Sequence, residues 1–291
     1  MRYNQGSRRS TVYAVLVNYN GLPHVLDGIL SLLDLARAPE RIVMVDNASR
    51  DGSPDIVRER FPMVELLTSP VNAGFAQGAN LGLELALQRG ADTVWLFNPD
   101  ARAHPRALEA MLRVLDADPQ VGAVGSLLRW AGRDRVQAWG GGRVSLVTGR
   151  ARHLTRPPDR GGLDYLCGAS LLLRARALRQ VGLLDPGFPL YWEDADLSLR
   201  LRRAGWRLAV APDSVVEHQP STGLGHDEAA WHRLYTGGSL RFFGKHAPLP
   251  WLPVGLGSAA RLARRLAQGR RAAAAGIIQG LFSRDWKKLP S

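Results

Sequence analysis

Short apolar runs alternate with segments of helical period along the first part of the chain. Residues 12–17 form the first run, and residues 41–45 and 64–67 form the next two. Between the first two runs, residues 22–35 repeat leucine at helical spacing with a proline near the start. Apolar runs without alternation are typical of strands buried on both faces. Because strand and helix alternate, the pattern predicts an α/β fold with a parallel, right-handed wound sheet.

A fourth apolar run, residues 93–97, stops abruptly at Asn98, Pro99 and Asp100. Proline cannot donate to a sheet and fixes its own φ, so we expect the strand to end here with Asp100 held in a defined direction. Ligands of open α/β sheets bind outside the carboxyl ends of the strands, and an oxygen-rich strand end suits a hard divalent cation that bridges to phosphate. An ordinary Asn-Pro-Asp turn is the alternative.

The next segments continue the alternation and then lose it. Helices are predicted over residues 105–115 and 174–181, and strands over residues 121–124, 163–173, 207–210 and 215–218. Residues 129–162 lack helical period and mix tryptophan and glycine with arginine, so we expect a long, partly ordered loop or hairpin over the site. Gly168 and Ala169 interrupt the strand over residues 163–173, at a place where a backbone approaches a ligand.

Small residues gather in the segment 72–82, where a helix is predicted to begin. Glycine and alanine there let backbone N–H groups approach an anion closely. They serve tight packing of a helix on a sheet equally well, and the segment lacks the glycine spacing and the lysine of known nucleotide loops. Both interpretations stay open.

Residues 190–197 place three acids behind two aromatic residues, namely Glu193, Asp194 and Asp196 after Tyr191 and Trp192. We expect a helix through Arg203 that begins near Asp194, and acids at a helix start are favoured by the helix dipole. The aromatic pair is explained better as a platform on which a sugar or base stacks. On such a helix Asp194 and Asp196 point apart, so only one of them can face a given ligand. His218 ends a later apolar run, as a structural histidine or as a ligand.

Length and charge narrow the class of protein. The 291 residues, 45% of them hydrophobic, are enough for one large core with an appendage. The formal charge of +12 lies at the ends: residues 1–11 carry three arginines and no acid, and residues 241–291 carry ten basic residues against Asp285. Acids and bases balance in residues 12–240. We therefore expect basic arms on a neutral domain, and no nucleic-acid partner.

The cellular compartment is predicted from the cysteine count and from the N-terminal sequence. A single cysteine, Cys167, excludes an internal disulfide and suits a reducing compartment. No secretory signal is visible, so we expect a cytoplasmic protein.

The C-terminal arm has arginines and apolar residues at helical spacing. The residues concerned are Trp251, Arg261, Arg264, Arg265, Ile277, Ile278, Leu281, Phe282, Arg284, Trp286, Lys287 and Lys288. No stretch reaches the roughly 18 apolar residues that span a bilayer. The arm is predicted to lie on an anionic membrane surface at the inner face of the cell membrane. A solvated basic helix packed on the domain is the alternative.

Five motifs in this order resemble those of the family 2 glycosyltransferases, inverting enzymes of the nucleotide-binding GT-A fold, and most closely their rhamnosyltransferase-like members. The motifs are Val17-Asn18-Tyr19-Asn20, Asp46-Asn47-Ala48-Ser49 with Asp51-Gly52-Ser53, Asn72-x-Gly74-Phe75 with Asn80 and Gly82, Asn98-Pro99-Asp100, and Trp192-Glu193-Asp194-x-Asp196-Leu197. The resemblance covers roughly residues 12–225. Individually the motifs are weak, and their shared order makes the set specific for the family but not for the sugar.

The resemblance implies a role for each motif. Asp194 matches the general base, Asp46 the acid that contacts the nucleobase, and Asp100 the metal-binding end of the Asp-x-Asp element, which holds Mg²⁺ or Mn²⁺ against the donor diphosphate. His218 resembles a residue that completes the metal shell, and Asn98 replaces the first Asp of the element, which weakens the metal site by one charge. The implied donor contacts are Asn18, Asn20, Asp46, Asn47, Ser49, Asn72, Gly74, Phe75, Asn80, Asn98 and Asp100, and the implied acceptor or sugar contacts are Gly168, Ala169, Tyr191, Trp192 and Glu193.

These inferences predict a basic arm over residues 1–11, a donor-binding half over 12–128, an acceptor-binding half over 129–240 and a membrane-association segment over 241–291. We expect an inverting glycosyltransferase that moves a sugar, plausibly rhamnose, from a dTDP- or UDP-linked donor to a hydroxyl of a cell-envelope or lipid-linked glycan. One rival is a nucleotidyltransferase, which would have a Gly-rich loop with Arg and Lys after the first strand. The other is a non-catalytic membrane- or nucleic-acid-binding protein, against which the neutral body and the carboxylates count.

Overall fold

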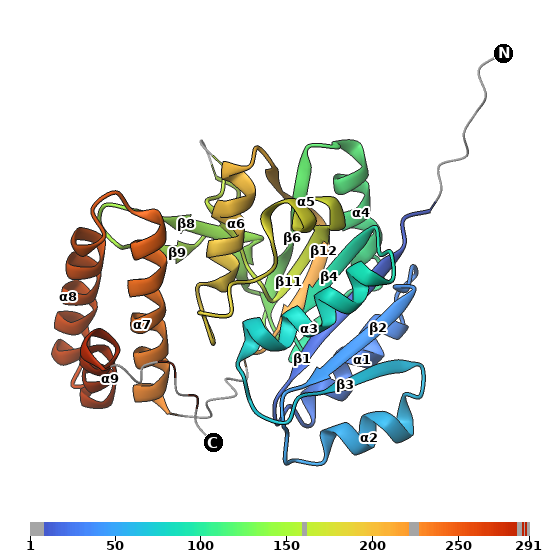
Figure 1. Ribbon diagram of the computed structural model, residues 1–291, viewed down its shortest axis with the longest axis horizontal. Helices are drawn as coiled ribbons and strands as arrows, with labels where there is room; N and C mark the ends of the chain where they lie inside the picture. The colour runs from blue at the N-terminus through green and yellow to red at the C-terminus, as the bar shows by residue number, and fades with distance from the viewer. Residues whose placement is uncertain (1–8, 159–161, 221–226, 284–286, 288, 290–291) are drawn as a thin grey trace.

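The computed structural model describes residues 9–158, 162–220, 227–283, 287 and 289, and a nine-stranded mixed sheet forms its centre (Figure 1). The strands are β1 (Val12–Asn18), β2 (Arg41–Asp46), β3 (Val64–Thr68), β4 (Thr93–Phe97), β5 (Ala101–Ala103), β6 (Val121–Trp130), β7 (Val136–Trp139), β11 (Ser170–Arg174) and β12 (Arg207–His218). Their order is β3-β2-β1-β4-β11-β6-β12-β5, with β7 paired to β6. Strands β1 to β4 run parallel, as do β6 and β12, whereas β11, β5 and β7 are antiparallel to their neighbours. The predicted α/β wound sheet is confirmed.

Helices α1 (His24–Leu33), α2 (Ser53–Arg60) and α3 (Phe75–Gln88) connect the first four strands. Because β1 and β2 are parallel and Asn18 pairs with Asp46 in register, their carboxyl ends meet at one edge of the sheet. Helix α3 lies close to the sheet through its glycines: a Cβ on Gly82 would come 2.5 Å from Val15 Cγ1, and one on Gly78 would come 2.9 Å from Val17 Cγ1. Of the two interpretations of these small residues, helix–sheet packing is the one that holds for Gly78 and Gly82.

Residues 129–162 are predicted to form a long, partly ordered loop or hairpin; in the described part, residues 129–158 and 162, the segment contains paired strands, so the hairpin alternative holds and the loop does not. Strand β6 continues to Trp130 and pairs with β7, and β8 (Gly141–Val144), β9 (Ala151–His153) and β10 (Tyr165–Leu166) form a second sheet in the order β10-β8-β9. The glycines that suggested a loop are sites of close strand contact instead. A Cβ on Gly141 would lie 2.0 Å from the Tyr165 carbonyl oxygen, and one on Gly142 would lie 2.1 Å from that of Arg152.

Helix α6 (Glu193–Arg203) begins one residue earlier than the sequence predicts. Trp192 is its N-cap residue, so Asp194 lies in the first turn and is not the cap. Tyr191 and Trp192 both have left-handed φ values, 70° and 75°.

The remaining helices of the sheet region, α4 (Ala107–Ala117) and α5 (Ala175–Val181), lie close to their predicted positions. The two strands predicted between residues 207 and 218 are one strand, β12, with a register shift.

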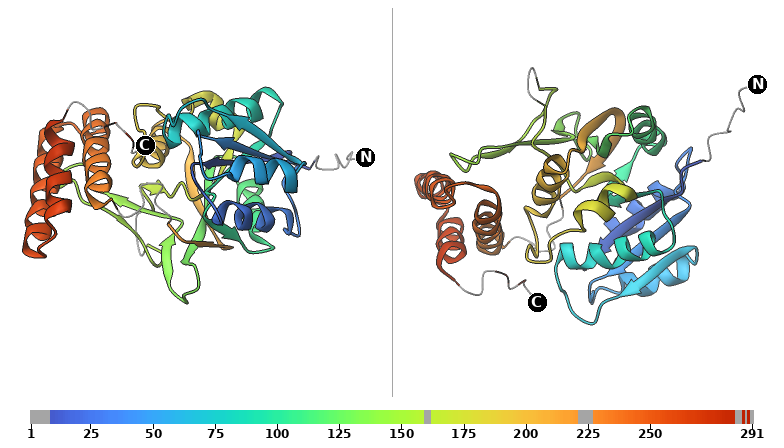
Figure 2. Two further views of the ribbon diagram at one scale, coloured as in Figure 1. Left: turned by 90° about the horizontal axis from the view of Figure 1, so that it is seen from below. Right: turned by 45° about the horizontal axis from the view of Figure 1, so that its top comes forward.

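Three C-terminal helices form a layer beside the sheet (Figures 1 and 2): α7 (Glu228–His246), α8 (Trp251–Ala267) and α9 (Arg271–Phe282). Helix α7 passes through residue 240, where the sequence placed the start of the C-terminal segment. Helix α9 lies against α7 at its glycines, because a Cβ on Gly276 would meet the Ala229 carbonyl oxygen at 2.2 Å. One face of α9 packs on the rest of the protein, as the alternative interpretation of the C-terminal arm predicted, and Ile277 on this face is fully buried. Phe282, in contrast, is 81% exposed.

Part of the C-terminal arm lies outside the described residues. Arg284, Trp286 and Lys288 lie outside the described residues. Within the described part of the chain, no helix combines the length and the apolar character that crossing a membrane requires.

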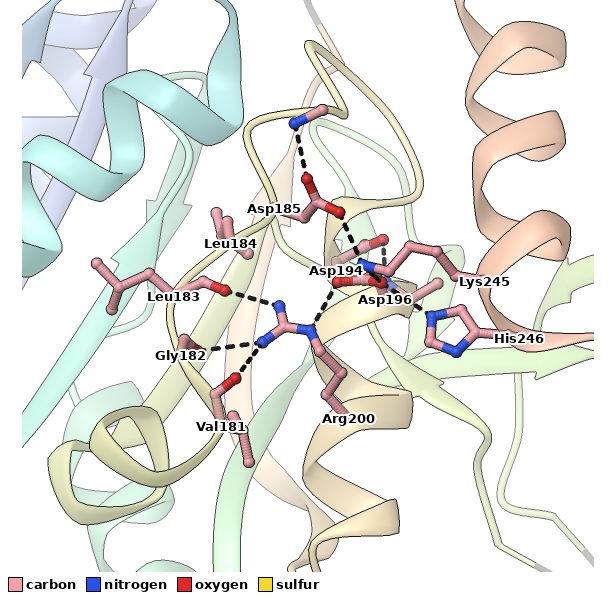
Figure 3. Close-up of polar contacts among 12 residues, drawn as sticks. Val181, Gly182, Leu183, Leu184, Asp185, Asp194, Asp196, Arg200, Lys245 and His246 are labelled. Atoms are coloured by element: carbon pink, nitrogen blue, oxygen red, sulfur yellow. Dashed lines mark hydrogen bonds and ion pairs between the residues drawn. The ribbon is translucent and has the colours of Figure 1, made fainter.

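A buried ion cluster joins α6, α7 and the segment that follows α5 (Figure 3). The fully buried Asp196 carboxylate contacts Arg200 Nε at 2.8 Å, Lys245 Nζ at 2.5 Å and His246 Nε2 at 2.9 Å. Burial alone would raise the pKa of Asp196, but the hydrogen bonds from His246 and Lys245 and the charge of Arg200 lower it to about 2. Lys245 also contacts Asp185 at 2.7 Å. These contacts hold the C-terminal end of α7 against the N-terminal part of α6.

The Asp196→Asn variant is expected to lose about 3 to 5 kcal/mol of unfolding free energy, because it leaves buried cations without their counter-charge. Since the folded pKa of Asp196 lies below its ordinary value of 3.8, its contribution is complete above pH 4 and is lost as the pH falls toward 2. Urea denaturation at pH 7 and at pH 3 measures both effects. The control is Asp134→Asn, whose ion pair with Arg129 is at the surface with Asp134 95% exposed. Equal stability of the two variants would exclude the cluster as a stabilising element.

Candidate active site

The carboxyl end of β4 and the end of β12 meet around His218. Its Nε2 atom lies 3.3 Å from Asp100 Oδ1 and 3.3 Å from Asn98 Nδ2. The backbone brings these residues together, because Gln219 N donates to the Asp100 carbonyl at 3.1 Å. The sequence-predicted metal residues Asp100 and His218 are therefore neighbours in space although 118 positions separate them.

Gln137 on β7 fixes the orientation of the His218 ring, and sequence analysis missed it. His218 Nδ1 lies 2.8 Å from Gln137 Oε1, which can only accept a hydrogen bond, so Nδ1 carries the proton and donates. Nε2 then accepts a hydrogen bond from Asn98 Nδ2 at 3.3 Å beside Asp100, and the ring is oriented by an outer hydrogen bond as in a metal-ligating imidazole. No signal in the sequence marked Gln137, since it falls in the segment predicted to be a loop or hairpin.

The donor set fits a divalent cation only in part. Among the described residues no group of three or more His, Cys, Asp or Glu side chains could hold a metal ion. Asp100 and His218 offer one carboxylate and one imidazole, with side chains 8% and 10% exposed. Mg²⁺ and Mn²⁺ commonly keep waters and substrate phosphates as ligands, so two protein ligands at a strand end fit a cation that arrives with a nucleotide.

A polar network holds Asp46 at the edge where β1 and β2 end. Asn18 Nδ2 lies 3.1 Å from Asp46 Oδ1, 3.0 Å from Ser49 Oγ and 2.7 Å from Ser53 Oγ. Ser49 N donates to Asp46 Oδ2 at 3.1 Å, and Asn20 N donates to Ser49 Oγ at 2.9 Å. Asn18 and Asp46 are buried, so the network fixes the carboxylate while leaving it lone pairs for a ligand.

The other predicted donor contacts hold loops in this structure. Asn47 Nδ2 donates to Asn72 Oδ1 and to the Gly74 carbonyl, both at 3.0 Å. Phe75 N donates to the Pro189 carbonyl at 2.7 Å, which a Cβ on Gly74 would block. Both amide atoms of Asn80 are engaged with the backbone of Leu184, at 2.8 and 3.0 Å. These residues connect the first part of the sheet to the segment before α6, and Asn80 has a structural role.

Asp194 faces a cavity of about 340 Å³. Its Oδ2 accepts a hydrogen bond from Gly168 N at 2.9 Å, and its Oδ1 accepts one from Ala195 N at 2.7 Å. The neighbouring Ala169 carbonyl accepts from Asn98 N at 3.0 Å. The interruption predicted at Gly168 and Ala169 thus joins Asp194 on one side to the end of β4 on the other. Asp196 lies elsewhere in the buried ion cluster, which confirms that the two acids point apart.

Of the predicted aromatic platform, only Tyr191 lies at the cavity with much of its ring. Trp192 is 5% exposed, its Nε1 donates to the Tyr235 carbonyl at 2.9 Å, and its ring packs on Phe242. The ring of Trp192 supports the wall from behind, so it is not a free stacking surface. Two α7 residues that sequence analysis missed complete the wall: Trp231 and Tyr235 are stacked with centroids 5.0 Å apart.

Burial raises the pKa of both acids of the cavity, and their other surroundings differ. It raises the pKa of Asp194, which the hydrogen bond from Gly168 and the nearby His153 oppose. It raises the pKa of Glu193 further, and the charge of Asp194 adds to this, while Glu193 Oε2 has no hydrogen-bond partner. Of this pair, Asp194 is therefore the one whose charged form receives hydrogen bonds from neighbouring backbone N–H groups and the charge of a nearby histidine.

His153 on β9 is a further cavity residue that the sequence did not indicate. Burial lowers its pKa, while the charge of Asp194 raises it and that of His218 lowers it. His153 Nδ1 lies 3.3 Å from the Tyr165 hydroxyl. Because it interacts with Asp194 and with His218, His153 connects the two sides of the site.

The mostly parallel wound sheet is that of the GT-A glycosyltransferase fold, and it carries one carboxylate at a strand end and a second carboxylate beside a cavity. Residues 9–233 match the family described as Glycosyltransferase like family 2. The chain belongs to this family and is a rhamnosyltransferase-like glycosyltransferase.

Similar proteins agree with this assignment. The chain is 31% identical over 241 residues to N-acetylglucosaminyl-diphospho-decaprenol L-rhamnosyltransferase of Mycobacterium tuberculosis (strain CDC 1551 / Oshkosh), covering 74% of this chain and 78% of that protein. It is 28% identical to the galactofuranosyltransferase GlfT1 of the same strain, covering 72% of this chain and 70% of that protein. The mannosyltransferase PcManGT of Pyrobaculum calidifontis, solved with GDP-Man and Mn²⁺, has the same fold with a TM-score of 0.62 at 21% identity, over 96% of this chain and 89% of that chain.

Asp100→Ala is expected to abolish the Mn²⁺-dependent stabilisation of the protein by a nucleoside diphosphate, because it removes the one carboxylate at the His218 corner. A ligand at 100 times its Kd stabilises the folded state by about 2.7 kcal/mol, which a thermal-shift titration with dTDP or UDP and Mn²⁺ detects as a rise in Tm. The control is Glu217→Gln, an exposed carboxylate one residue from His218. A full Mn²⁺ response in the alanine variant would remove Asp100 from the metal site.

Proposed function

We propose that this glycosyltransferase transfers a sugar from a nucleoside-diphosphate donor to a hydroxyl of a lipid-linked glycan acceptor with inversion at the anomeric carbon. The observation that carries the proposal is the pair of carboxylate sites on the two sides of the Gly168–Ala169 segment. Single displacement needs a base for the acceptor hydroxyl on one face and charge neutralisation of the leaving diphosphate on the other. Asp194 serves the first need, and the Asp100–His218 corner serves the second.

Different residues of the site have different roles in one displacement reaction at the anomeric carbon. Asp194 takes the proton of the acceptor hydroxyl as the acceptor oxygen forms its bond to the anomeric carbon, and the bond from that carbon to the donor diphosphate breaks. Asp46, Asn18 and Ser49 bind the nucleoside. Asp100 and His218 would hold Mg²⁺ or Mn²⁺, which when bound neutralises the diphosphate that leaves. Tyr191, Trp231 and Tyr235 exclude water from the acceptor side of the cavity.

The donor sugar is proposed to be rhamnose from dTDP-rhamnose, on the basis of the mycobacterial rhamnosyltransferase, which acts on a diphospho-decaprenol acceptor. The similarity to GlfT1 makes galactofuranose the second candidate. A transfer assay with dTDP-rhamnose and with UDP-galactofuranose, each with a prenyl-diphospho-N-acetylglucosamine acceptor, distinguishes them. Product from neither donor with any acceptor of this class would contradict the proposed function.

A peripheral position at the inner membrane face fits a lipid-linked acceptor. Large exposed hydrophobic residues gather in the C-terminal layer, at Leu249, Trp251, Leu256, Leu266, Ile278 and Phe282. Trp251 is 69% exposed, and α8 and α9 contain four arginines and no acid. Exposed apolar residues among cations are typical of a surface that binds anionic lipid.

Asp194→Asn is expected to lower kcat by about 10²- to 10⁴-fold with donor affinity unchanged, because an amide cannot accept the proton. The matched control Glu193→Gln should cost much less, since burial and the charge of Asp194 raise the pKa of Glu193 and make it the weaker candidate for an ionised base. Burial raises the pKa of Asp194 above 3.8, and the base must be ionised. In the wild type kcat should therefore fall as the pH drops through a value above 3.8, and Asp194→Asn should lack this limb. A larger loss in Glu193→Gln would reverse the assignment.

The double variant Trp251→Ser/Phe282→Ser is expected to weaken binding to vesicles of phosphatidylglycerol at least tenfold, since burying one large apolar side chain contributes about 1.5 to 3 kcal/mol. Binding of the wild type should also weaken with added salt. The control is Met63→Ser/Val71→Ser, which changes two exposed hydrophobic residues outside the C-terminal layer. Sedimentation of the protein with vesicles measures the effect. Equal binding of both double variants would show that the layer does not contact lipid.

A further inference from the structure

A second, larger groove lies between the segment 148–152 and helix α8, with a volume of about 860 Å³. Five arginines line it, and no acid does: Arg150, Arg152, Arg261, Arg264 and Arg265. The two walls are held close together, because a Cβ on Gly149 would lie 2.0 Å from the Pro253 carbonyl oxygen. The groove is therefore a defined part of the fold with a strongly cationic lining.

The groove is continuous with the Asp194 cavity. Arg152, Arg261, Arg265, Tyr235 and Ala151 line both. A molecule that places a hydroxyl at Asp194 can thus extend directly into the groove. The end of β4, where Asp100 lies, does not contribute to either lining, so the groove is separate from the corner assigned to the donor diphosphate.

The side chains of the five groove arginines can bind an anion. In the described part of the chain no carboxylate forms an ion pair with any of the five. Arg261 lies over the Tyr235 ring at 5.1 Å and donates to Ser258 Oγ at 3.2 Å, while its buried Nε has no hydrogen-bond partner. An unpartnered buried donor favours a ligand that accepts from it.

The positive field of these arginines acts on neighbouring groups. Burial, together with the charges of Arg265, Arg261 and Arg270, lowers the pKa of His232 to about 4, although Glu228 acts in the opposite direction. Burial and the charges of Arg270 and Arg264 also lower the pKa of Arg265 itself. Cations that repel one another in this way are stabilised when a polyvalent anion binds between them.

The rest of the lining is apolar. Leu256, Gly257 and Ala260 of α8 form the wall opposite Arg150, and Leu256 is half exposed. Such a surface fits a molecule with an anionic group next to a hydrocarbon chain. Because α8 also carries the exposed Trp251, a chain that leaves the groove along α8 reaches the surface proposed to bind lipid.

We infer that the groove binds the diphosphate of a prenyl-diphosphate-linked acceptor, with the acceptor sugar in the Asp194 cavity and the first prenyl units along Leu256. This inference rests on the proposed function, since it names the part of the lipid-linked acceptor that the arginines bind. Guanidinium groups pair with phosphate oxygens through two parallel hydrogen bonds, so several arginines suit a diphosphate.

The test uses Arg150→Gln/Arg264→Gln, because both side chains are exposed and line the groove but not the Asp194 cavity. The matched control is Arg133→Gln/Arg271→Gln, which removes two exposed charges outside the groove. Three probes are compared by equilibrium binding and by transfer assays: a short-chain prenyl-diphospho-N-acetylglucosamine, the prenyl N-acetylglucosaminide that lacks the diphosphate, and dTDP with Mn²⁺. The groove variant should bind the diphosphate probe at least tenfold more weakly, with a matching rise in KM and little change in kcat.

The other outcomes distinguish the proposals. Binding of the neutral glycoside and of dTDP should be the same in the wild type and in both double variants. An equal loss for the diphosphate probe and the neutral glycoside, or unchanged binding of both, would overturn the groove assignment. A loss for dTDP instead would assign the groove to the donor. If the wild type binds the diphosphate probe through the groove but forms no product with any donor, the groove assignment stands and the proposed function fails.

Discussion

The two carboxylate sites of this glycosyltransferase depend on the short segment that links a strand of the small sheet to a strand of the central sheet. Between β10 and β11 the chain leaves regular pairing for a few residues, and there Gly168 N donates to Asp194 while the Ala169 carbonyl accepts from Asn98. Peptide units are planar and stiff, so two adjacent residues set the separation of Asp194, the proposed base, and the end of β4 within narrow limits. A displacement reaction requires such a fixed separation, because nucleophile and leaving group must lie on opposite faces of one carbon.

The position of Asp194 is maintained at a cost in backbone conformation. Tyr191 and Trp192 both have left-handed φ values, which cost of order 1 to 3 kcal/mol each for residues other than glycine. Burial of the Trp192 ring among Phe242, Phe243 and Tyr235 offsets this cost, and a Cβ on Gly238 would come within 2.9 Å of that ring. The Asp196 cluster holds the same helix from its other side. Helix α7 thus stabilises the strained turn that positions Asp194.

The sequence predicted the elements that depend on local residue patterns. It missed the site residues that tertiary contacts bring together. Buried runs such as β1 and β4 and the strand end at Asp100 followed from apolar runs and proline chemistry. His153, Gln137 and Tyr235 did not, since strands rich in glycine and arginine have no clear period and α7 reaches the cavity only by packing. Asn80 was assigned to the donor because its motif carries a free amide in the sequence, whereas in the fold Leu184 engages both of its polar atoms. A side chain's type is visible in a sequence, but its partner is not.

The charge distribution also changes meaning once the chain is folded. Arg261 and Arg265 belong to the basic arm in the sequence, yet in the structure they line the cavity of the base. Cations near Asp194 lower its affinity for a proton and so weaken it as a base. A diphosphate bound between the arginines would neutralise that field, which makes Asp194 a stronger base when an acceptor is in place than when the cavity is empty. On this argument, the groove proposed to bind the acceptor would also adjust the proton affinity of Asp194, the proposed base.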